Sequence, residues 1–152
     1  MSDQSNSAPA CRCDYTMAFL ILRLFLGLRT LLAGIEKFEA KGTYSFANYY
    51  ENMNRMANGI TGASFLPLWA TKSFALSLGY LLTILGVALL LGLKTRLTLF
   101  ASGLLYVGLG FGLMAVQEGE GVAWIGMQVS MFVGALLLVR YNRFALWADK
   151  TR

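Results

Sequence analysis

Three apolar runs without a single charged residue fill most of the C-terminal half of this chain. They cover residues 74–93, 97–116 and 122–139, and only short segments separate them. A helix needs about 20 apolar residues to cross a hydrocarbon core of roughly 30 Å. Because lipid cannot satisfy an open backbone, each run must be helical and neighbouring runs must be antiparallel. The pattern therefore predicts a polytopic membrane protein.

A fourth apolar run, 17–35, lies nearer the N-terminus and contains Arg23 and Arg29. The polar tail before it holds one arginine, and no small-residue cleavage site follows it. We therefore predict a retained first span and not a secretory signal.

Composition indicates one small membrane domain. The chain of 152 residues is 57% hydrophobic and 14% charged, which leaves no room for a separate soluble catalytic domain. We predict an all-α, four-helix membrane bundle over residues 16–149, after a disordered cytoplasmic tail over 1–15. The sequence has no histidine, which is the commonest metal ligand and the usual haem ligand. We expect no metal centre, no intrinsic cofactor and no nucleic-acid partner.

The basic residues are distributed unevenly between the two sides of such a bundle. The side with both termini would carry Arg12, Lys94, Arg96, Arg140, Arg143, Lys150 and Arg152. The opposite side would carry Lys37, Lys41, Arg55 and Lys72. The positive-inside rule then predicts a multi-pass protein of the cell inner (plasma) membrane with both termini in the cytoplasm.

The connection between the first two spans, 36–72, is too long for an empty loop. Tyrosine, phenylalanine and methionine recur in it at helical spacing, opposite a polar face that includes Asn48. Ser45 can cap the start of this helix and Gly59 its end. We predict a short amphipathic helix along the outer membrane interface. It is either a lid over the bundle or the rim of a site for an amphipathic ligand.

One face of the first span combines basic and small residues, namely Arg23, Gly27, Thr30, Gly34 and Lys37. An arginine inside a span has to reach a carboxylate, a water-filled cavity or the lipid headgroups. Arg23 is close enough to the inner edge to snorkel, whereas Arg29 is nearer the middle. This face is either a packing seam or part of a polar site.

The other spans also carry small residues at helical spacing, which lets helices approach closely. The predicted packing positions there are Gly79, Gly86, Gly108, Gly112, Gly126, Ser130, Gly134 and Gln128. Tyr106 is a plausible hydrogen-bond partner for Gln128, although Gln128 could instead contact a ligand.

Three segments of the chain resemble the DoxX family. They are 22–38, LRLFLGLRTLLAGIEKF, then 86–97, GVALLLGLKTRL, and 143–149, RFALWAD. The resemblance covers about residues 20–149 and implies a four-helix integral membrane fold. The family includes the small subunit type of thiosulfate:quinone oxidoreductase. Its members often carry a carboxylate early in the second helix, whereas 81–85 here reads LLTIL.

The resemblance implies a membrane subunit associated with a quinone-linked oxidoreductase. It would anchor a partner and contribute a quinone or small-anion site at the outer face. The candidate ligand-binding residues are Arg23, Arg29, Glu36, Lys37, Asn48, Tyr49, Tyr50 and Trp69. Apart from the tail thiols of Cys11 and Cys13 the chain offers no redox group, so the electron carrier must be bound or belong to a partner.

Two alternatives stay open. One is a non-catalytic assembly subunit that uses its small-residue faces to join other membrane subunits or a second copy of the chain. The other is a small transporter, since intramembrane arginines often mark anion paths.

Overall fold

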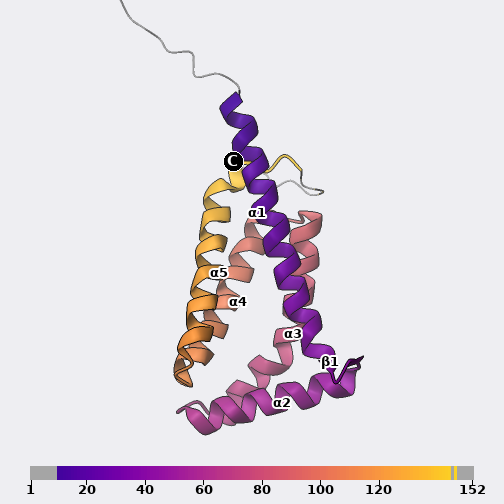
Figure 1. The fold of residues 1–152 in the computed structure, drawn as a ribbon, viewed down its shortest axis with the longest axis vertical. Helices are drawn as coiled ribbons and strands as arrows, with labels where there is room; N and C mark the ends of the chain where they lie inside the picture. Colours follow the sequence, from indigo (N-terminus) through magenta and orange to yellow (C-terminus); the bar gives the residue numbers. More distant parts are fainter. Residues whose placement is uncertain (1–9, 145, 147–152) are drawn as a thin grey trace, which may run out of the picture.

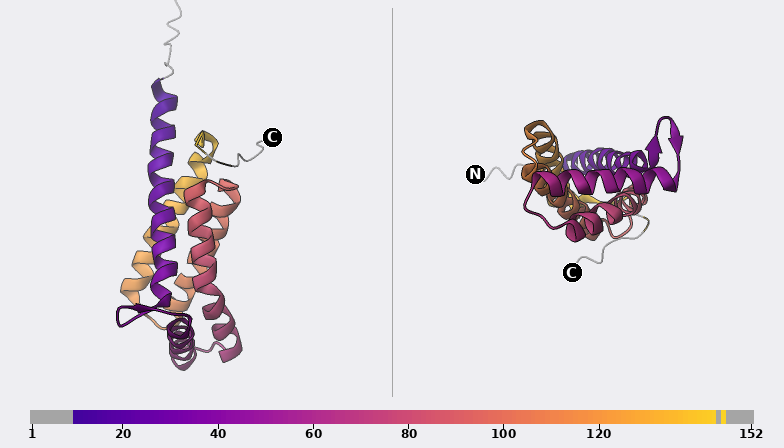
Figure 2. Two further views of the ribbon diagram at one scale, coloured as in Figure 1. Left: turned by 90° about the vertical axis from the view of Figure 1, so that its right-hand side faces the viewer. Right: turned by 90° about the horizontal axis from the view of Figure 1, so that it is seen from below.

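The computed structural model describes residues 10–144 and 146, and side chains from residue 13 onward. This part of the chain is almost entirely helical. Its elements are α1 (Ala10–Ile35), the 3-10 helix η1 (Glu36–Phe38), strands β1 (Glu39–Ala40) and β2 (Thr43–Tyr44), helices α2 (Phe46–Ala63), α3 (Leu68–Leu91), α4 (Thr95–Ala115) and α5 (Gly119–Leu138), and the 3-10 helix η2 (Val139–Tyr141). Helices α1, α3, α4 and α5 form a bundle, and α2 lies across one end of it (Figures 1 and 2).

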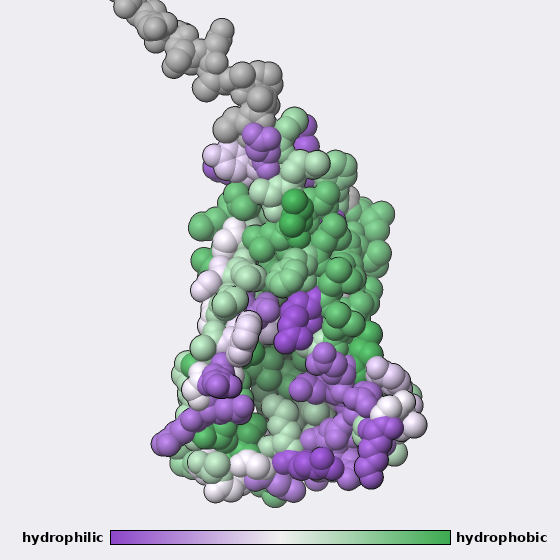
Figure 3. All heavy atoms as spheres, viewed as in Figure 1, coloured by the Kyte–Doolittle hydropathy of each residue, from purple (hydrophilic) through white to green (hydrophobic). Residues whose placement is uncertain are grey.

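In the described part of the chain, four helices are long and apolar enough to cross a membrane, as the sequence predicts. These segments are Cys13–Phe38, Leu68–Leu91, Thr95–Ala115 and Gly119–Tyr141. Large apolar side chains cover much of their outward surface (Figure 3). Since such a surface is stable only in contact with lipid, the chain is a multi-pass membrane protein.

Two spans begin earlier than the apolar runs. Helix α1 starts at Ala10, so residues 10–15 are helical where a disordered tail is predicted. No proline or glycine occurs from Ala10 to Leu26, so nothing interrupts the helix there. Helix α3 starts directly after Pro67, whose φ of −70° and extended ψ lead into the first turn. The polar residues of 68–73 therefore belong to α3.

The connection between α1 and α3 differs from the prediction in two details. Ser45 does cap α2, since its hydroxyl accepts from the Asn48 N–H at 3.1 Å. The helix does not end at Gly59 but continues to Ala63, because Gly59 keeps helical dihedrals. In addition, β1 and β2 form a small hairpin whose turn at 41–42 has positive φ at both residues, as a tight hairpin requires.

Close helix contacts occur where glycines leave room. On the α1–α3 contact, Gly34 faces Thr83 and Gly27 faces Leu90, while Gly86 faces the Leu31 backbone. A Cβ built on Gly86 would lie 2.6 Å from the Leu31 nitrogen. These three glycines therefore set the separation of α1 and α3.

Other glycines have different surroundings. Gly79 packs against the ring of Tyr49, which brings α2 onto α3. On α5, Gly126 and Gly134 have no neighbour within 4 Å among the described residues, and Ser130 is exposed. This face of α5 is open.

Candidate functional site

A cavity of about 720 Å³ lies between α2 and the adjacent ends of the four spans. Figure 3 shows a hollow at this end of the molecule, with hydrophobic walls and hydrophilic residues around it. Its apolar and glycine wall is formed by Ala33, Met56, Gly59, Ile60, Ala63, Leu66, Ala70, Phe74, Leu82, Gly108, Leu109, Phe111, Gly112, Leu113, Val116 and Ile125. Its polar lining consists of Arg29, Glu36, Lys37, Thr71, Tyr106 and Glu118.

The last turns of α1 supply most of the charge. Arg29, Ala33, Glu36 and Lys37 recur at helical spacing, so one face of α1 and η1 turns toward the cavity. Among the described residues, the side chains of Arg29, Glu36 and Lys37 make no hydrogen bond or ion pair. A bound molecule could therefore use these groups without displacing a protein partner.

Two glycines on α4 provide space on the opposite wall. Gly108 faces the ring of Phe74, and Gly112 faces Ile60 of α2. Larger side chains at either position would project into the cavity. The GxxxG pattern of α4, predicted as a packing face, thus lines this cavity.

The Tyr106 hydroxyl is buried in the bundle and has no hydrogen-bond partner in the described part of the chain, nor has the Thr30 hydroxyl. The Thr30 hydroxyl is a neighbour of the Tyr106 hydroxyl, and the charges of Arg29 and Glu36 also act on it. A buried hydroxyl without a partner is costly. A polar ligand atom in the cavity would remove this cost.

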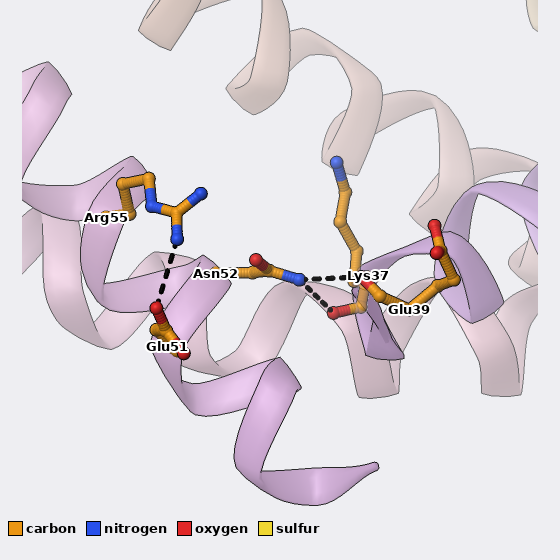
Figure 4. A network of polar contacts seen from close by, with 5 residues as sticks. All are labelled: Lys37, Glu39, Glu51, Asn52 and Arg55. Atoms are coloured by element: carbon orange, nitrogen blue, oxygen red, sulfur yellow. Dashed lines mark hydrogen bonds and ion pairs between the residues drawn. The ribbon is translucent and has the colours of Figure 1, made fainter. Parts of the chain in front are cut away.

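Contacts from α2 hold the backbone of η1 in place. The Asn52 amide donates to the carbonyl of Glu39 at 2.9 Å and to that of Lys37 at 3.4 Å. The Lys37 ammonium group points away from these contacts (Figure 4). On α2 itself, Arg55 forms an exposed ion pair with Glu51 at 3.1 Å.

Tyr49 joins α2 to α3 and does not line the cavity. Its hydroxyl donates to the Leu76 carbonyl at 2.6 Å and accepts from the Gly79 N–H at 3.2 Å. Its ring stacks on Phe38 with centroids 4.5 Å apart. Burial of this side chain raises the pKa of Tyr49 above its ordinary value.

The other predicted site residues of this region lie outside the cavity. The Asn48 amide donates to the Thr43 carbonyl at 2.9 Å and so supports the hairpin. Tyr50 and Trp69 are exposed on the outer surface. The structure thus brings Arg29, Glu36 and Lys37 together, but not Asn48, Tyr49, Tyr50 or Trp69.

Arg23 lies at the other end of the bundle. It is only 4% exposed, and it donates to the Asn142 side-chain oxygen at 3.0 Å and to the Phe144 carbonyl at 2.6 Å. The Asn142 amide in turn donates to the Thr95 hydroxyl at 2.7 Å. Arg23 therefore ties the segment after η2 to α1 and α4, and it is remote from Arg29 and Lys37.

The sequence reasoning missed several polar groups of the cavity. Tyr106 is predicted to bond Gln128, but the side-chain oxygens of both are buried without a partner among the described residues. The Tyr106 ring instead packs on Phe132, with centroids 5.2 Å apart. Thr71 and Glu118 are not among the predicted ligand-binding residues. A signal for Tyr106 did exist, since it is a polar group in the middle of an apolar run.

Groups of three or more potential metal ligands are not found in the described residues. Cys13 is an exposed free thiol. The side chain of Cys11 lies outside those that the structure describes.

Fold and cavity together define a class of protein, a helical multi-pass membrane protein with an amphipathic cavity at one end. The sequence model of the DoxX family matches residues 18–117. The chain therefore belongs to the DoxX family. The match includes Arg29, Glu36, Lys37 and Tyr106 and ends just before Glu118. No curated protein and no solved structure matches the chain.

Proposed function

We propose that this DoxX-family protein is a membrane subunit associated with a quinone-linked oxidoreductase, and that its cavity under α2 binds a quinone or a small anion. The observation that carries the proposal is the composition of this cavity. Ligand sites are typically about 300–1,000 Å³, mainly apolar, with a few convergent polar groups. The cavity has this size and combines apolar walls with Arg29, Lys37 and the Tyr106 hydroxyl, which has no hydrogen-bond partner among the described residues.

The balance of charge favours an uncharged headgroup with an apolar tail over a multivalent anion. Two cations and two carboxylates line the cavity, namely Arg29, Lys37, Glu36 and Glu118. The cations and the Tyr106 hydroxyl are donors suited to a quinone carbonyl. A bound quinone would supply redox chemistry, and the partner enzyme would supply electrons.

We further propose that α2 lies along the outer membrane surface and covers the site. Its inner side packs on α3 through Tyr49, Met53 and Ala57, and its other side carries the ion pair of Glu51 with Arg55. Exposed aromatic side chains surround this end of the bundle, namely Tyr44, Phe46, Tyr50, Phe65, Trp69 and Trp124. Aromatic residues concentrate at membrane interfaces, which supports this placement.

Quinone binding is the decisive test. We expect wild-type protein in nanodiscs to bind a short-chain quinone, measured by quenching of tryptophan fluorescence. Arg29→Gln, Lys37→Gln and Tyr106→Phe each remove one donor and should weaken binding roughly five- to tenfold. Arg55→Gln is the matched control, because it removes a cation from the exposed side of α2. Equal binding by all variants, or no binding by wild type, would contradict the proposal.

An assembly subunit is the second candidate, and the open face of α5 favours it. This helix is the least buried of the four spans, and Gly126 and Gly134 have no neighbour in the described chain. If this face docks on a partner, Gly126→Leu with Gly134→Leu should reduce the size of the complex extracted in mild detergent. Met127→Leu should leave it unchanged. Quinone binding would persist in both variants.

A further inference from the structure

A second cavity, of about 370 Å³, lies at the end of the bundle opposite α2. It is lined by Thr16 of α1, by Arg140 and Tyr141 of η2, and by Arg143. Two guanidinium groups and two hydroxyl groups thus meet in one place, and the lining residues that the structure describes include no carboxylate. Guanidinium groups bind phosphate oxygens with paired, charge-assisted hydrogen bonds.

The two arginines are available to a ligand. No ion pair joins Arg140 or Arg143 to an acidic residue in the part of the chain that the structure describes. The Arg140 guanidinium carbon lies 4.9 Å from the centre of the Tyr141 ring, and that ring stacks on Tyr15 at 5.0 Å. These aromatic contacts hold Arg140 in position without neutralising its charge.

The backbone around Arg143 is fixed on both sides. Arg23 binds the Asn142 side chain and the Phe144 carbonyl, and Asn142 also bonds Thr95. The residues before and after Arg143 are therefore tied to α1 and α4. A binding site that is already ordered loses less conformational entropy when its ligand arrives.

The cavity lies where a lipid headgroup would be. The first candidate span begins at Cys13 and the last one ends at Tyr141. Thr16 therefore belongs to the first turn of one span and Arg140 to the last turn of the other. Met17, which follows Thr16, and Leu137, about one helical turn before Arg140, expose apolar side chains that could contact acyl chains. A free phosphate would gain nothing from these apolar groups. The described lining offers no carboxylate to the ammonium group of a zwitterionic headgroup, which favours an anionic lipid.

We propose that this cavity binds the phosphate of an anionic phospholipid in the leaflet that faces the chain termini. It is a site separate from the cavity under α2, and it does not depend on the function proposed for that cavity.

The lipids that the purified protein retains test this proposed binding of an anionic phospholipid directly. Full-length protein is reconstituted in nanodiscs of mixed phosphatidylglycerol and phosphatidylcholine and examined by native mass spectrometry after release. We expect wild type to retain phosphatidylglycerol preferentially. Arg140→Gln with Arg143→Gln should reduce this preference roughly tenfold or more. Lys94→Gln is the control, because it removes a cation at the same end outside the cavity.

Three outcomes of the lipid-retention experiment would overturn the proposal. They are equal retention of the two lipids by wild type, an undiminished preference in the double variant, and a loss of preference in Lys94→Gln as large as in the double variant. If inorganic phosphate alone raises the melting temperature as much as phosphatidylglycerol does, the site is one for a soluble anion, which also overturns the assignment to lipid. If the double variant misfolds, the preference of the wild-type protein for phosphatidylglycerol over phosphatidylcholine still tests the proposal.

Discussion

The hydroxyl of Tyr49 bonds two backbone groups of α3 from a fully buried position. The sequence places this tyrosine on an amphipathic helix and suggests a ligand contact. In the structure its role is to attach α2 to the bundle. Since α2 closes one side of the cavity, Tyr49 affects the site by positioning this helix.

Tyr49→Phe should lower the free energy of unfolding by about 1–2 kcal/mol, because the phenol loses its backbone bonds. Wild type should also lose stability at high pH. The raised pKa of Tyr49 means that the folded state favours the neutral phenol. That contribution is complete below the ordinary value of about 10 and is lost as the pH rises through the raised pKa. Denaturant titrations between pH 8 and 11 should show a smaller loss in Tyr49→Phe. The exposed Tyr44→Phe is the control, and an identical pH profile in all three proteins would contradict this.

Arg23 and Arg29 show how differently two intramembrane arginines can be accommodated. The sequence correctly indicates that each needs a polar environment. It does not indicate that Arg23 obtains one from Asn142 and Phe144, at sequence separations of 119 and 121 residues. Arg29 has no such partner among the described residues and borders the cavity instead. The difference depends on tertiary packing, because their local sequences are equally apolar.

Among the helices, the pair α1 and α3 depends most on glycine. Gly27, Gly34 and Gly86 let the two backbones approach, as the small-residue spacing of the first span suggests. The same spacing of small residues does not bring two helices together in α4 and α5. Gly108 and Gly112 of α4 border the cavity, and Gly126 and Gly134 of α5 have no neighbour within 4 Å among the described residues. The spacing alone predicts a helix face made of small side chains. It does not specify whether another helix, a ligand or a partner protein packs against that face.

Gly86→Ala should destabilise the bundle by about 1–3 kcal/mol, because the added methyl group would meet the Leu31 backbone, which cannot move aside. Gly126→Ala, which meets nothing within 4 Å, should be neutral or slightly stabilising. Helical circular dichroism during unfolding in a denaturing detergent compares the two. Similar effects of both substitutions would contradict the close α1–α3 contact.

At the scale of the whole molecule, the described glutamates are concentrated at one end, whereas Asp14 lies at the other. Among the described residues, all five glutamates belong to the α2 end, namely Glu36, Glu39, Glu51, Glu118 and Glu120. Lys94, Arg96, Arg140 and Arg143 belong to the end with the termini. The lysines and arginines whose side chains the structure describes are divided equally, since Lys37, Lys41, Arg55 and Lys72 belong to the α2 end. The cytoplasmic placement of the termini therefore stays a prediction from the full sequence, in which the positive-inside rule counts seven basic residues against four.

A membrane-impermeant maleimide tests this orientation in intact cells. In a protein with Cys11→Ser, the exposed thiol of Cys13 should react only after permeabilisation. In a protein that lacks both native cysteines, Asn58→Cys on the exposed side of α2 should react without it. The reverse pattern of labelling would show the opposite orientation.

The four spans, the amphipathic helix between the first two and its cap at Ser45 can all be predicted from the amino-acid sequence. Each of these follows from hydropathy and hydrogen bonding within a few neighbouring residues. The positions of Arg29, Lys37 and Tyr106 around one cavity, and of Arg23 and Arg143 at the opposite end, become known only from the three-dimensional fold. These arrangements depend on how distant helices pack. A local pattern cannot specify such contacts, because several packings bury the same apolar faces equally well.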